Sequence, residues 1–207
     1  MIEPARIHPT AIVEAGAEVG AGTSIWDHAH VRAGAVVGRE CIVGEKTYLA
    51  SGVRVGDRVK INAAVYIPFG ITIEDGVMIA AHVVFTNDKN PRATDPDLAR
   101  LQTSAPTEAT LRCLVERGAS IGANATIGPG LVLGAYCMVG MGAVVTRDVP
   151  PHGLVVGNPA RLVALVARDG SVVRTIEDGA LPRNARIACP GDGALVIAEG
   201  TVRHVSA

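Results

Sequence analysis

The sequence has few aromatic residues and little net charge. Of 207 residues, one is Trp, three are Tyr and two are Phe, so the aromatic platforms that bind single-stranded nucleic acids are not expected. The formal net charge of −1 offers no basic surface to nucleic acid or to an anionic membrane. We therefore expect neither a nucleic-acid partner nor a membrane partner.

The cysteines and the apolar residues also lack the spacing of other common architectures. Cys41, Cys113, Cys137 and Cys189 form no CxxC or CxxxC pair, so neither a zinc site nor a disulfide framework is indicated. No run of 18 uncharged apolar residues occurs, and residues 1–10 lack the charged and apolar regions of a signal peptide. These features predict a cytoplasmic protein, and its length suffices for one domain with a complete core.

The dominant positive feature is an apolar residue at every sixth position. The series runs from Ile7 to Phe85 and resumes from Val115 to Val145. With apolar residues at 48% of the chain, chance would produce this series about once in a million in a fixed frame. A helix requires a period of about 3.6 and a strand a period of about 2, so the repeat itself must be the structural unit.

Hexapeptide repeats of this kind predict an all-β protein, a parallel β-helix. Each hexad supplies one short strand and one corner, three hexads close a triangular coil, and the recurring apolar residue points into a shared core. The residue four positions later is commonly small or β-branched, as in Ala11, Val53 and Ala125, and forms a second inward position. Glycine is expected at many sharply turning corners, namely Gly16, Gly22, Gly34, Gly52, Gly70, Gly76, Gly118, Gly130 and Gly142.

The repeat is interrupted by a long excursion, residues 86–114, that is rich in Asn, Asp, Pro and Arg. Loops of this length inside compact folds are usually functional. A solenoid also tolerates a functionless insertion at any edge, which is the alternative.

The repeat ends at Pro150-Pro151, so we assign the β-helix with its excursion to residues 1–150 and a C-terminal cap to residues 151–207. Asn158-Pro159 resembles a helix N-terminus and predicts a short helix that continues to Val166. Alternating apolar and polar residues after that point predict short strands that cover the open end of the β-helix.

A set of short motifs spreads over almost the whole chain. They are Ile25-Trp26 and His30, Gly56-Asp57 with Lys60-Ile61, Val65-Tyr66, Val83-Val84-Phe85-Thr86-Asn87, Asn90-Pro91-Arg92, Gly118-Ala119, Ile121-Gly122-Ala123-Asn124, Val156-Gly157 with Pro159-Ala160-Arg161, and Cys189-Pro190. In these motifs the chain resembles the hexapeptide-repeat acyltransferases, and most closely the nucleotide-sugar 3-amino N-acetyltransferases that act on UDP-2-acetamido-3-amino-2,3-dideoxyglucuronate. Phe-Thr-Asn followed by Asn-Pro-Arg is the narrowest of these motifs. The resemblance implies a left-handed β-helix and a homotrimer, whereas ordinary crossover rules favour the right hand.

The resemblance also implies a reaction, in which acetyl-CoA gives its acetyl group to the 3-amino group of a UDP- or dTDP-linked sugar between subunits. The amine must be uncharged, the thioester carbonyl needs hydrogen-bond donors, and both substrates must be held in line. The leaving thiol has a pKa of about 8.5, so a strong acid is unnecessary. No metal is expected.

Asn87 and His82 are the candidate catalytic residues. The asparagine that matches Asn87 in the resembling enzymes lies beside the reacting amine, while an asparagine that closes a turn is the alternative. His82 precedes Asn87 by five residues, at the mouth of the excursion, and is a candidate general base or a plain surface imidazole. If the coils stack in register, one polar edge contains His28, Lys46, Ala64, His82, Asn124 and Gly142.

Five further residues are assigned to the nucleotide sugar. Asp88 either attracts an ammonium group or only solvates the loop. Lys60 and Arg92 suit a diphosphate or a sugar carboxylate, and the alternative is that both are ordinary surface charges. Asn62 lies shortly after Lys60 in the sequence, at an outward position, and is assigned to the same ligand. His30 matches a family histidine on the nucleotide-sugar side, although a histidine packed on the neighbouring Trp would look the same.

Two alanines, Ala63 and Ala64, stand where the resembling enzymes have polar residues. The identity of the sugar is therefore not fixed by the resemblance.

Acetyl-CoA is expected in the groove between neighbouring β-helices, with its pantetheine arm against the backbone of the upper coils. Asn124, Gly142 and Ala143 are assigned to this groove, because small corners admit a close approach. Arg147 and Arg161 are assigned to the phosphates of the coenzyme.

Three other functions share this fold. The gamma-class carbonic anhydrases hold zinc with three histidines, but His82 has no partner histidine at the required spacing. A non-catalytic scaffold would have no use for the polar segment 85–92. An acyltransferase for a 4-amino sugar or a hydroxyl acceptor is the third alternative.

Overall fold

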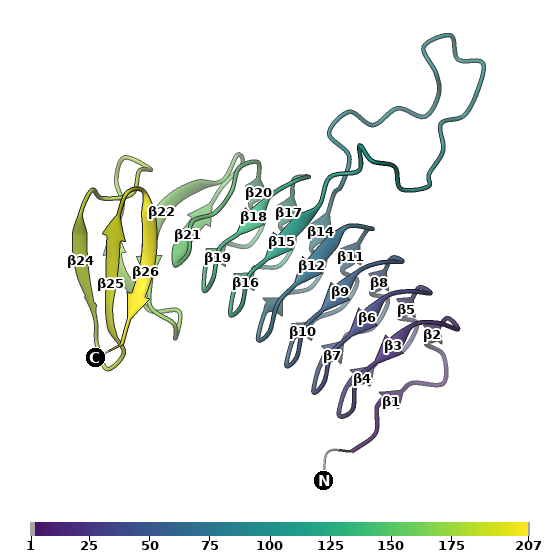
Figure 1. Ribbon diagram of the computed structural model, residues 1–207, viewed down its shortest axis with the longest axis horizontal. Helices are drawn as coiled ribbons and strands as arrows, with labels where there is room; N and C mark the ends of the chain where they lie inside the picture. Colours follow the sequence, from purple (N-terminus) through teal and green to yellow (C-terminus); the bar gives the residue numbers. More distant parts are fainter. Residues whose placement is uncertain (1–2, 207) are drawn as a thin grey trace.

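The computed structural model describes residues 3–206, and within that range the regular structure is β-strand throughout, without a helix. The strands wind into a triangular β-helix whose coils stack along one axis (Figure 1). At the C-terminal end a group of longer antiparallel strands covers the last coil, and one irregular loop projects from the side.

Three parallel sheets form the three faces of the β-helix. Face 1 contains β1 (Arg6–Ile7), β4 (Ser24–Ile25), β7 (Ile42–Val43), β10 (Lys60–Ile61), β13 (Met78–Ile79), β16 (Ser120–Ile121), β19 (Met138–Val139) and β21 (Gly153–Val156). Face 2 contains β2 (Ile12–Val13), β5 (His30–Val31), β8 (Tyr48–Leu49), β11 (Tyr66–Ile67), β14 (Val84–Phe85), β17 (Thr126–Ile127) and β20 (Val144–Val145). Face 3 contains β3 (Glu18–Val19), β6 (Val36–Val37), β9 (Arg54–Val55), β12 (Ile71–Ile73), β15 (Cys113–Val115) and β18 (Val132–Leu133).

The repeated apolar residue of each strand points inward and stacks on its counterpart in the next coil. Ile61 pairs with Ile79 and Ile79 with Ile121, and each of these side chains is at most 1% exposed. Full burial of such a side chain contributes about 1.5–3 kcal/mol relative to exposure. The predicted parallel β-helix is confirmed, and the arrangement is consistent with the left hand that the resemblance implies.

Small inward residues and turning glycines occupy the corners as expected. Val53 and Ala125 are fully buried, and each glycine predicted at a corner has a positive φ, as at Gly16 with 90°. The predicted polar edge is also present, because the N–H of His82 donates to the Ala63 carbonyl and the N–H of Asn124 donates to the Ala81 carbonyl. Both residues have left-handed φ values, near 60°, so a turning corner explains their position without any function.

The excursion leaves the β-helix at the corner between face 2 and face 3, after β14, and returns at β15. Residues 86–112 contain no strand, and an isolated bridge between Thr94 and Leu101 closes the tip. β14 still pairs with β17, and β12 still pairs with β15. The excursion therefore extends outward without shifting the register of the coils.

The coil continues past Pro150-Pro151, because β21 pairs in parallel with β19. The helix predicted from Asn158-Pro159 to Val166 is wrong. Residues 161–166 form β22 (Arg161–Val166), which pairs antiparallel with β21. The edge of β21 offers main-chain partners, and the β-branched residues of this segment suit a strand, so Asn158-Pro159 lies in a turn instead of a helix cap.

Short strands follow β22, as the alternating pattern predicts. β23 (Val172–Thr175) extends face 1, and a separate antiparallel sheet contains β24 (Ala185–Cys189), β25 (Gly193–Ala198) and β26 (Thr201–Val205). Leu195 and Ile197 of β25 are buried in a core continuous with that of the β-helix. These strands cover the end of the solenoid, which would otherwise expose its apolar interior.

A buried histidine lies where the last coil meets this C-terminal sheet. His152 is 2% exposed, its Nδ1 lies 3.0 Å from the Val166 carbonyl oxygen, and its ring stacks on Tyr136 and on His204. His204 in turn lies 3.2 Å from a carboxylate oxygen of Asp192. Burial lowers the pKa of His152 below its ordinary value. The hydrogen bond to the Val166 carbonyl opposes this effect, and the charge of Arg168 adds to it.

Protonation of His152 is expected to destabilise the protein in mildly acid solution. Because the pKa of His152 is lower in the folded state, the unfolded state binds more protons as the pH falls through about 6.5, and stability falls with it. Thermal melts between pH 7.5 and pH 5.5 should show a falling Tm in the wild type and a flatter dependence in His152→Gln. The exposed His8→Gln is the control. An unchanged pH dependence in His152→Gln would contradict this assignment.

Candidate active site

A large cavity lies between the excursion and face 2 of the β-helix, with a volume of about 1050 Å³. Its size suits a ligand larger than a single sugar. The β-helix side is lined by Arg32, Tyr48, Ala50, Ser51, Tyr66, Pro68 and Phe69. The excursion side is lined by Asn87, Asp88, residues 90–93, residues 102–107, Ala109 and Thr110.

Asn87 is held in the cavity wall by hydrogen bonds at both its side chain and its backbone. Its Nδ2 donates to the Phe69 carbonyl at 3.0 Å, and its carbonyl accepts from the N–H of Leu111 at 3.0 Å. The side chain therefore has a structural role, but it joins neighbouring coils and does not close a turn, which was the alternative. One N–H of the amide is bound to Phe69, so Asn87 retains its carboxamide oxygen and its second N–H for a ligand.

Asp88 and Arg92 follow Asn87 along the same wall, and both are exposed. Asp88 Oδ1 accepts from the N–H of Asn90 at 2.8 Å, and Arg92 Nη1 donates to the Pro91 carbonyl at 2.8 Å. The structure thus brings together three of the predicted site residues, an amide, a carboxylate and a guanidinium, around one cavity.

His30 lies on β5 of face 2, below this cavity in the stack of coils. Its Nε2 is 2.8 Å from Glu14 Oε1, and its ring meets Tyr48 edge-on with 5.5 Å between centroids. The alternative was a histidine packed on Trp26, but the His30 ring meets Tyr48, and the Trp26 ring lies against the Arg6 guanidinium.

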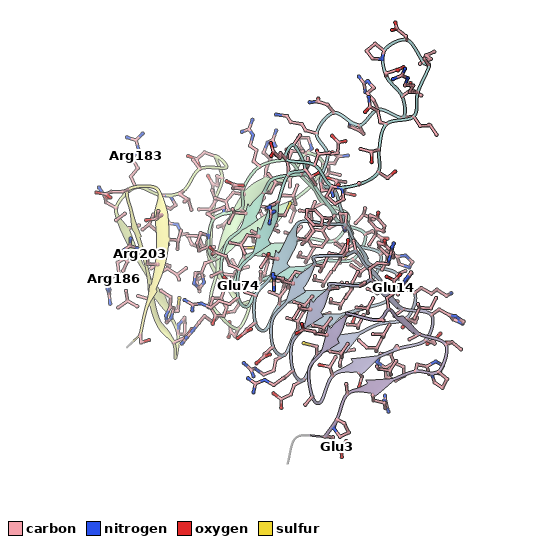
Figure 2. All side chains as sticks on the ribbon, turned by 45° about the vertical axis from the view of Figure 1, so that its right-hand side comes forward. Glu3, Glu14, Glu74, Arg183, Arg186 and Arg203 are labelled. Carbon is pink, nitrogen blue, oxygen red and sulfur yellow. The ribbon has the colours of Figure 1, made fainter. Side chains whose placement is uncertain are left out.

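Glu14 organises a network that the sequence reasoning missed, and Figure 2 labels Glu14 on the flank of the β-helix away from the C-terminal strands. Its carboxylate contacts His30 and Arg32, and Arg32 Nη1 donates to the Tyr48 hydroxyl at 3.0 Å. The main-chain N–H of Ala33, then His30 and Arg32, lower the pKa of Glu14 to about 2. Glu14 is therefore ionised at neutral pH.

A second group of predicted residues lies on the far side of face 2 from the excursion. His82, Asn124 and Gly142 occupy the corner between faces 1 and 2, Lys60 is on face 1, and Asn62 begins that corner. The chain from His82 to the excursion runs along β14, one whole side of the triangle, which spans on the order of 15 Å. Within one chain His82 is therefore separated from the cavity and does not lie at its mouth.

The residues assigned to the coenzyme are only partly surface residues. Ala143 is completely buried, whereas Gly142 is exposed, and a Cβ added there would meet no atom within 4 Å. Arg147 and Arg161 are both exposed and line a second cavity of about 620 Å³ near the C-terminal end. The structure therefore brings the two arginines together but excludes the Ala143 side chain from any groove.

The cysteines are free and buried, and burial raises the pKa of Cys137 to about 12, which makes it a poor nucleophile. In residues 3–206 no cluster of three His, Cys, Asp or Glu side chains is placed to bind a metal. The same range has no helix with the length and apolar character needed to cross a bilayer.

Two families of repeats match this sequence. Residues 112–147 match the bacterial transferase hexapeptide family (six repeats), and residues 35–68 match the hexapeptide repeat of succinyl-transferase. These matches identify hexapeptide repeats in two parts of the β-helix. The resemblance to hexapeptide-repeat acyltransferases is thereby confirmed.

The hexapeptide-repeat protein is similar to named transferases over part of its length. It is 47% identical over 70 residues to a dTDP-3-amino-3,6-dideoxy-alpha-D-galactopyranose 3-N-acetyltransferase of Aneurinibacillus thermoaerophilus, which covers 34% of this chain and 36% of that protein. The match therefore spans about a third of the relative.

Solved structures share the fold of the hexapeptide-repeat protein. The acetyltransferase domain of PglB from Neisseria gonorrhoeae FA1090, in complex with acetyl coenzyme A, matches with a TM-score of 0.50 at 22% identity over 78% of this chain and 58% of that one. A hexapeptide transferase family protein from Anaplasma phagocytophilum matches with a TM-score of 0.52 at 14% identity over 80% and 81% of the two chains. At these identities the likeness is one of fold alone.

Proposed function

We propose that this hexapeptide-repeat protein is an N-acetyltransferase that moves an acetyl group from acetyl-CoA to the 3-amino group of a UDP- or dTDP-linked amino sugar. The observation that carries the proposal is Asn87, fixed by Phe69 in the wall of a cavity with polar groups on both sides. The relative that is named for a dTDP-3-amino sugar supports the acceptor class.

In the proposed reaction the neutral amine attacks the thioester carbonyl, so that a C–N bond forms and the C–S bond breaks. The carboxamide oxygen of Asn87 accepts one N–H of the amine and aims its lone pair at the carbonyl. The proton that nitrogen loses is taken up by a base, by water or by the departing CoA sulfur. Asp88 attracts the acceptor as an ammonium before it is deprotonated, and Arg92 pairs with negative charge on the nucleotide sugar.

The proposal includes a homotrimer with each active site shared between two copies. Within one chain His82, Asn124 and Lys60 face away from the cavity, so they reach an acceptor only if a neighbouring copy presents its edge to the excursion. The coenzyme then runs between the two copies, and Arg147 and Arg161 meet its phosphates in the second cavity. Sedimentation should give the mass of a trimer. If the His82 imidazole takes the proton from the amine, His82→Ala should alter the pH profile of the rate.

A substrate panel tests the proposal directly. The protein is incubated with acetyl-CoA and with UDP- and dTDP-linked 3-amino and 4-amino sugars, and free thiol is followed. Release of thiol only with a 3-amino sugar is the expected result. Turnover with a 4-amino sugar or a hydroxyl acceptor instead would assign another acyltransferase, and no turnover with any acceptor would favour a scaffold.

Asn87→Ala is expected to lower kcat/KM for the amino sugar at least about tenfold, which corresponds to about 1.4 kcal/mol of barrier. The matched control is Thr86→Val, because Thr86 Oγ1 also donates to a main-chain carbonyl, that of Ile127 at 3.0 Å, but does not line the cavity. Each variant loses one structural hydrogen bond, about 1 kcal/mol, so their Tm values should fall alike. Equal rates in both variants would remove Asn87 from the reaction.

A further inference from the structure

Outward side chains on face 2 form a column that rises toward the excursion, one residue in each coil. His30, Tyr48, Tyr66 and Val84 occupy successive places, since β5 pairs with β8, β8 with β11 and β11 with β14. The rings of Tyr48 and Tyr66 are stacked, with 5.3 Å between centroids and 8° between planes. Two of the few aromatic residues in this chain thus form a platform in the wall of the cavity.

The lower ring of this platform is fixed from beneath. The Tyr48 hydroxyl accepts a hydrogen bond from Arg32, and the ring meets His30 edge-on. Both of these residues are held by the ionised carboxylate of Glu14. Tyr48 therefore has little freedom, and the orientation of Tyr66, which stacks on it, is set by the same network.

The upper side of the platform is open. The next place in the column is Val84, which has a short side chain and cannot cover a tyrosine ring, and Tyr66 remains 45% exposed. The excursion lies beyond this place, since it begins directly after β14 and shares the cavity with Tyr66. Coils are spaced by about 4.8 Å, so one planar ring fits at the level of Val84 as a third member of the stack.

We propose that the pyrimidine base of the acceptor stacks on Tyr66 at the level of Val84, beneath the excursion. This inference rests on the proposed function, which supplies a UDP- or dTDP-linked acceptor, and adds the residues that bind its nucleotide. Arg32 is neutralised by Glu14, so Arg92 on the opposite wall is the cation for the diphosphate. The sugar then extends along the excursion toward Asn87.

Binding of the free nucleotides UDP and dTDP by titration calorimetry tests the platform without any acetyl transfer. Stacking of a base on an aromatic side chain contributes about 1–3 kcal/mol, so Tyr66→Leu should raise the Kd about tenfold or more. Tyr66→Phe keeps the ring and should bind as the wild type does. Val84→Tyr places a protein ring in the open position and should abolish binding.

The matched control is Val36→Tyr, which adds the same ring at an outward position of face 3, away from the cavity. This variant should bind both nucleotides normally, and acetyl-CoA should bind equally to all four variants. Size-exclusion chromatography and Tm confirm that each variant keeps the wild-type assembly.

The outcomes separate the inference from the proposed function. If Tyr66→Leu and Val84→Tyr bind UDP or dTDP as tightly as the wild type, the platform is not the base site, although transfer to amino sugars still stands. If the wild type acetylates an amino sugar but binds neither nucleotide, the platform is again overturned. If the wild type neither binds a nucleotide nor releases thiol with any acceptor, both proposals fail.

Discussion

Replacing residues 86–112 by Gly-Pro-Gly should abolish acetyl transfer while the β-helix stays folded. The next coil turns the same corner with Gly128-Pro129-Gly130, and Phe85 lies in register with Ile127. The short corner can therefore join β14 to β15 without moving either strand. It removes Asn87, Arg92 and one wall of the cavity, so kcat/KM should fall at least about a hundredfold, as expected when positioning is lost. Thiol release and a thermal melt measure the two effects.

A smaller deletion provides the control for the excursion. Thr94 and Leu101 form an antiparallel bridge, and residues 95–100 beyond it do not line the cavity. Replacing those six residues by Asn-Gly gives a two-residue hairpin turn and should leave the rate unchanged. Full activity in the longer deletion would place the acceptor site elsewhere. Loss of folding in that variant would mean that contacts made by the excursion, among them the hydrogen bond from Asn87 to Phe69, hold the corner together.

The period of six predicts the fold because the inward positions obey a strict steric rule. A residue such as Ile79 or Ile121 must be apolar at every coil, since the triangular interior has no room for water or for a charge. The excursion is equally visible, because its residues break that rule. Its length, its polar composition and the motif around Asn87 were sufficient to locate the cavity wall.

The outward positions obey no such rule, and there the sequence was less informative. His30, Tyr48 and Tyr66 recur at one position per coil, but the signal is visible only when outward residues are aligned coil by coil. The distance of His82 from Asn87 along the chain predicts a place at the mouth of the excursion. In a triangular coil, five residues can lead from one corner to the next, so nearness in sequence does not mean nearness in space.

The C-terminal error has a different cause. Asn followed by Pro is favoured both at a helix start and in a tight turn, and local propensity does not separate the two. Residues 161–166 form a strand because β22 pairs antiparallel with the free edge of β21. Such tertiary pairing cannot be predicted from residues 158–166 alone.

Gly38→Ala is expected to destabilise the β-helix by about 3 kcal/mol, the upper part of the usual range for overpacking. Gly38 does not need a positive φ, but a Cβ there would lie 2.4 Å from the Gly56 carbonyl oxygen and 2.5 Å from Asp57 Oδ1. Asp57 cannot easily retreat, because the same oxygen accepts from the N–H of Arg39 at 2.8 Å. The added methyl group would therefore force two coils apart.

Gly16→Ala is the matched comparison, because Gly16 has a φ of 90° and a Cβ there would meet nothing within 4 Å. The Gly16→Ala variant carries only the cost of holding an alanine in the left-handed backbone conformation, about 1–2 kcal/mol. Urea denaturation should therefore show a larger loss of stability for Gly38→Ala than for Gly16→Ala. Equal losses would mean that the stacked coils separate at little cost. The spacing between coils would then not be the constraint that keeps glycine at this corner, and the rigid platform under the excursion would lose its physical basis.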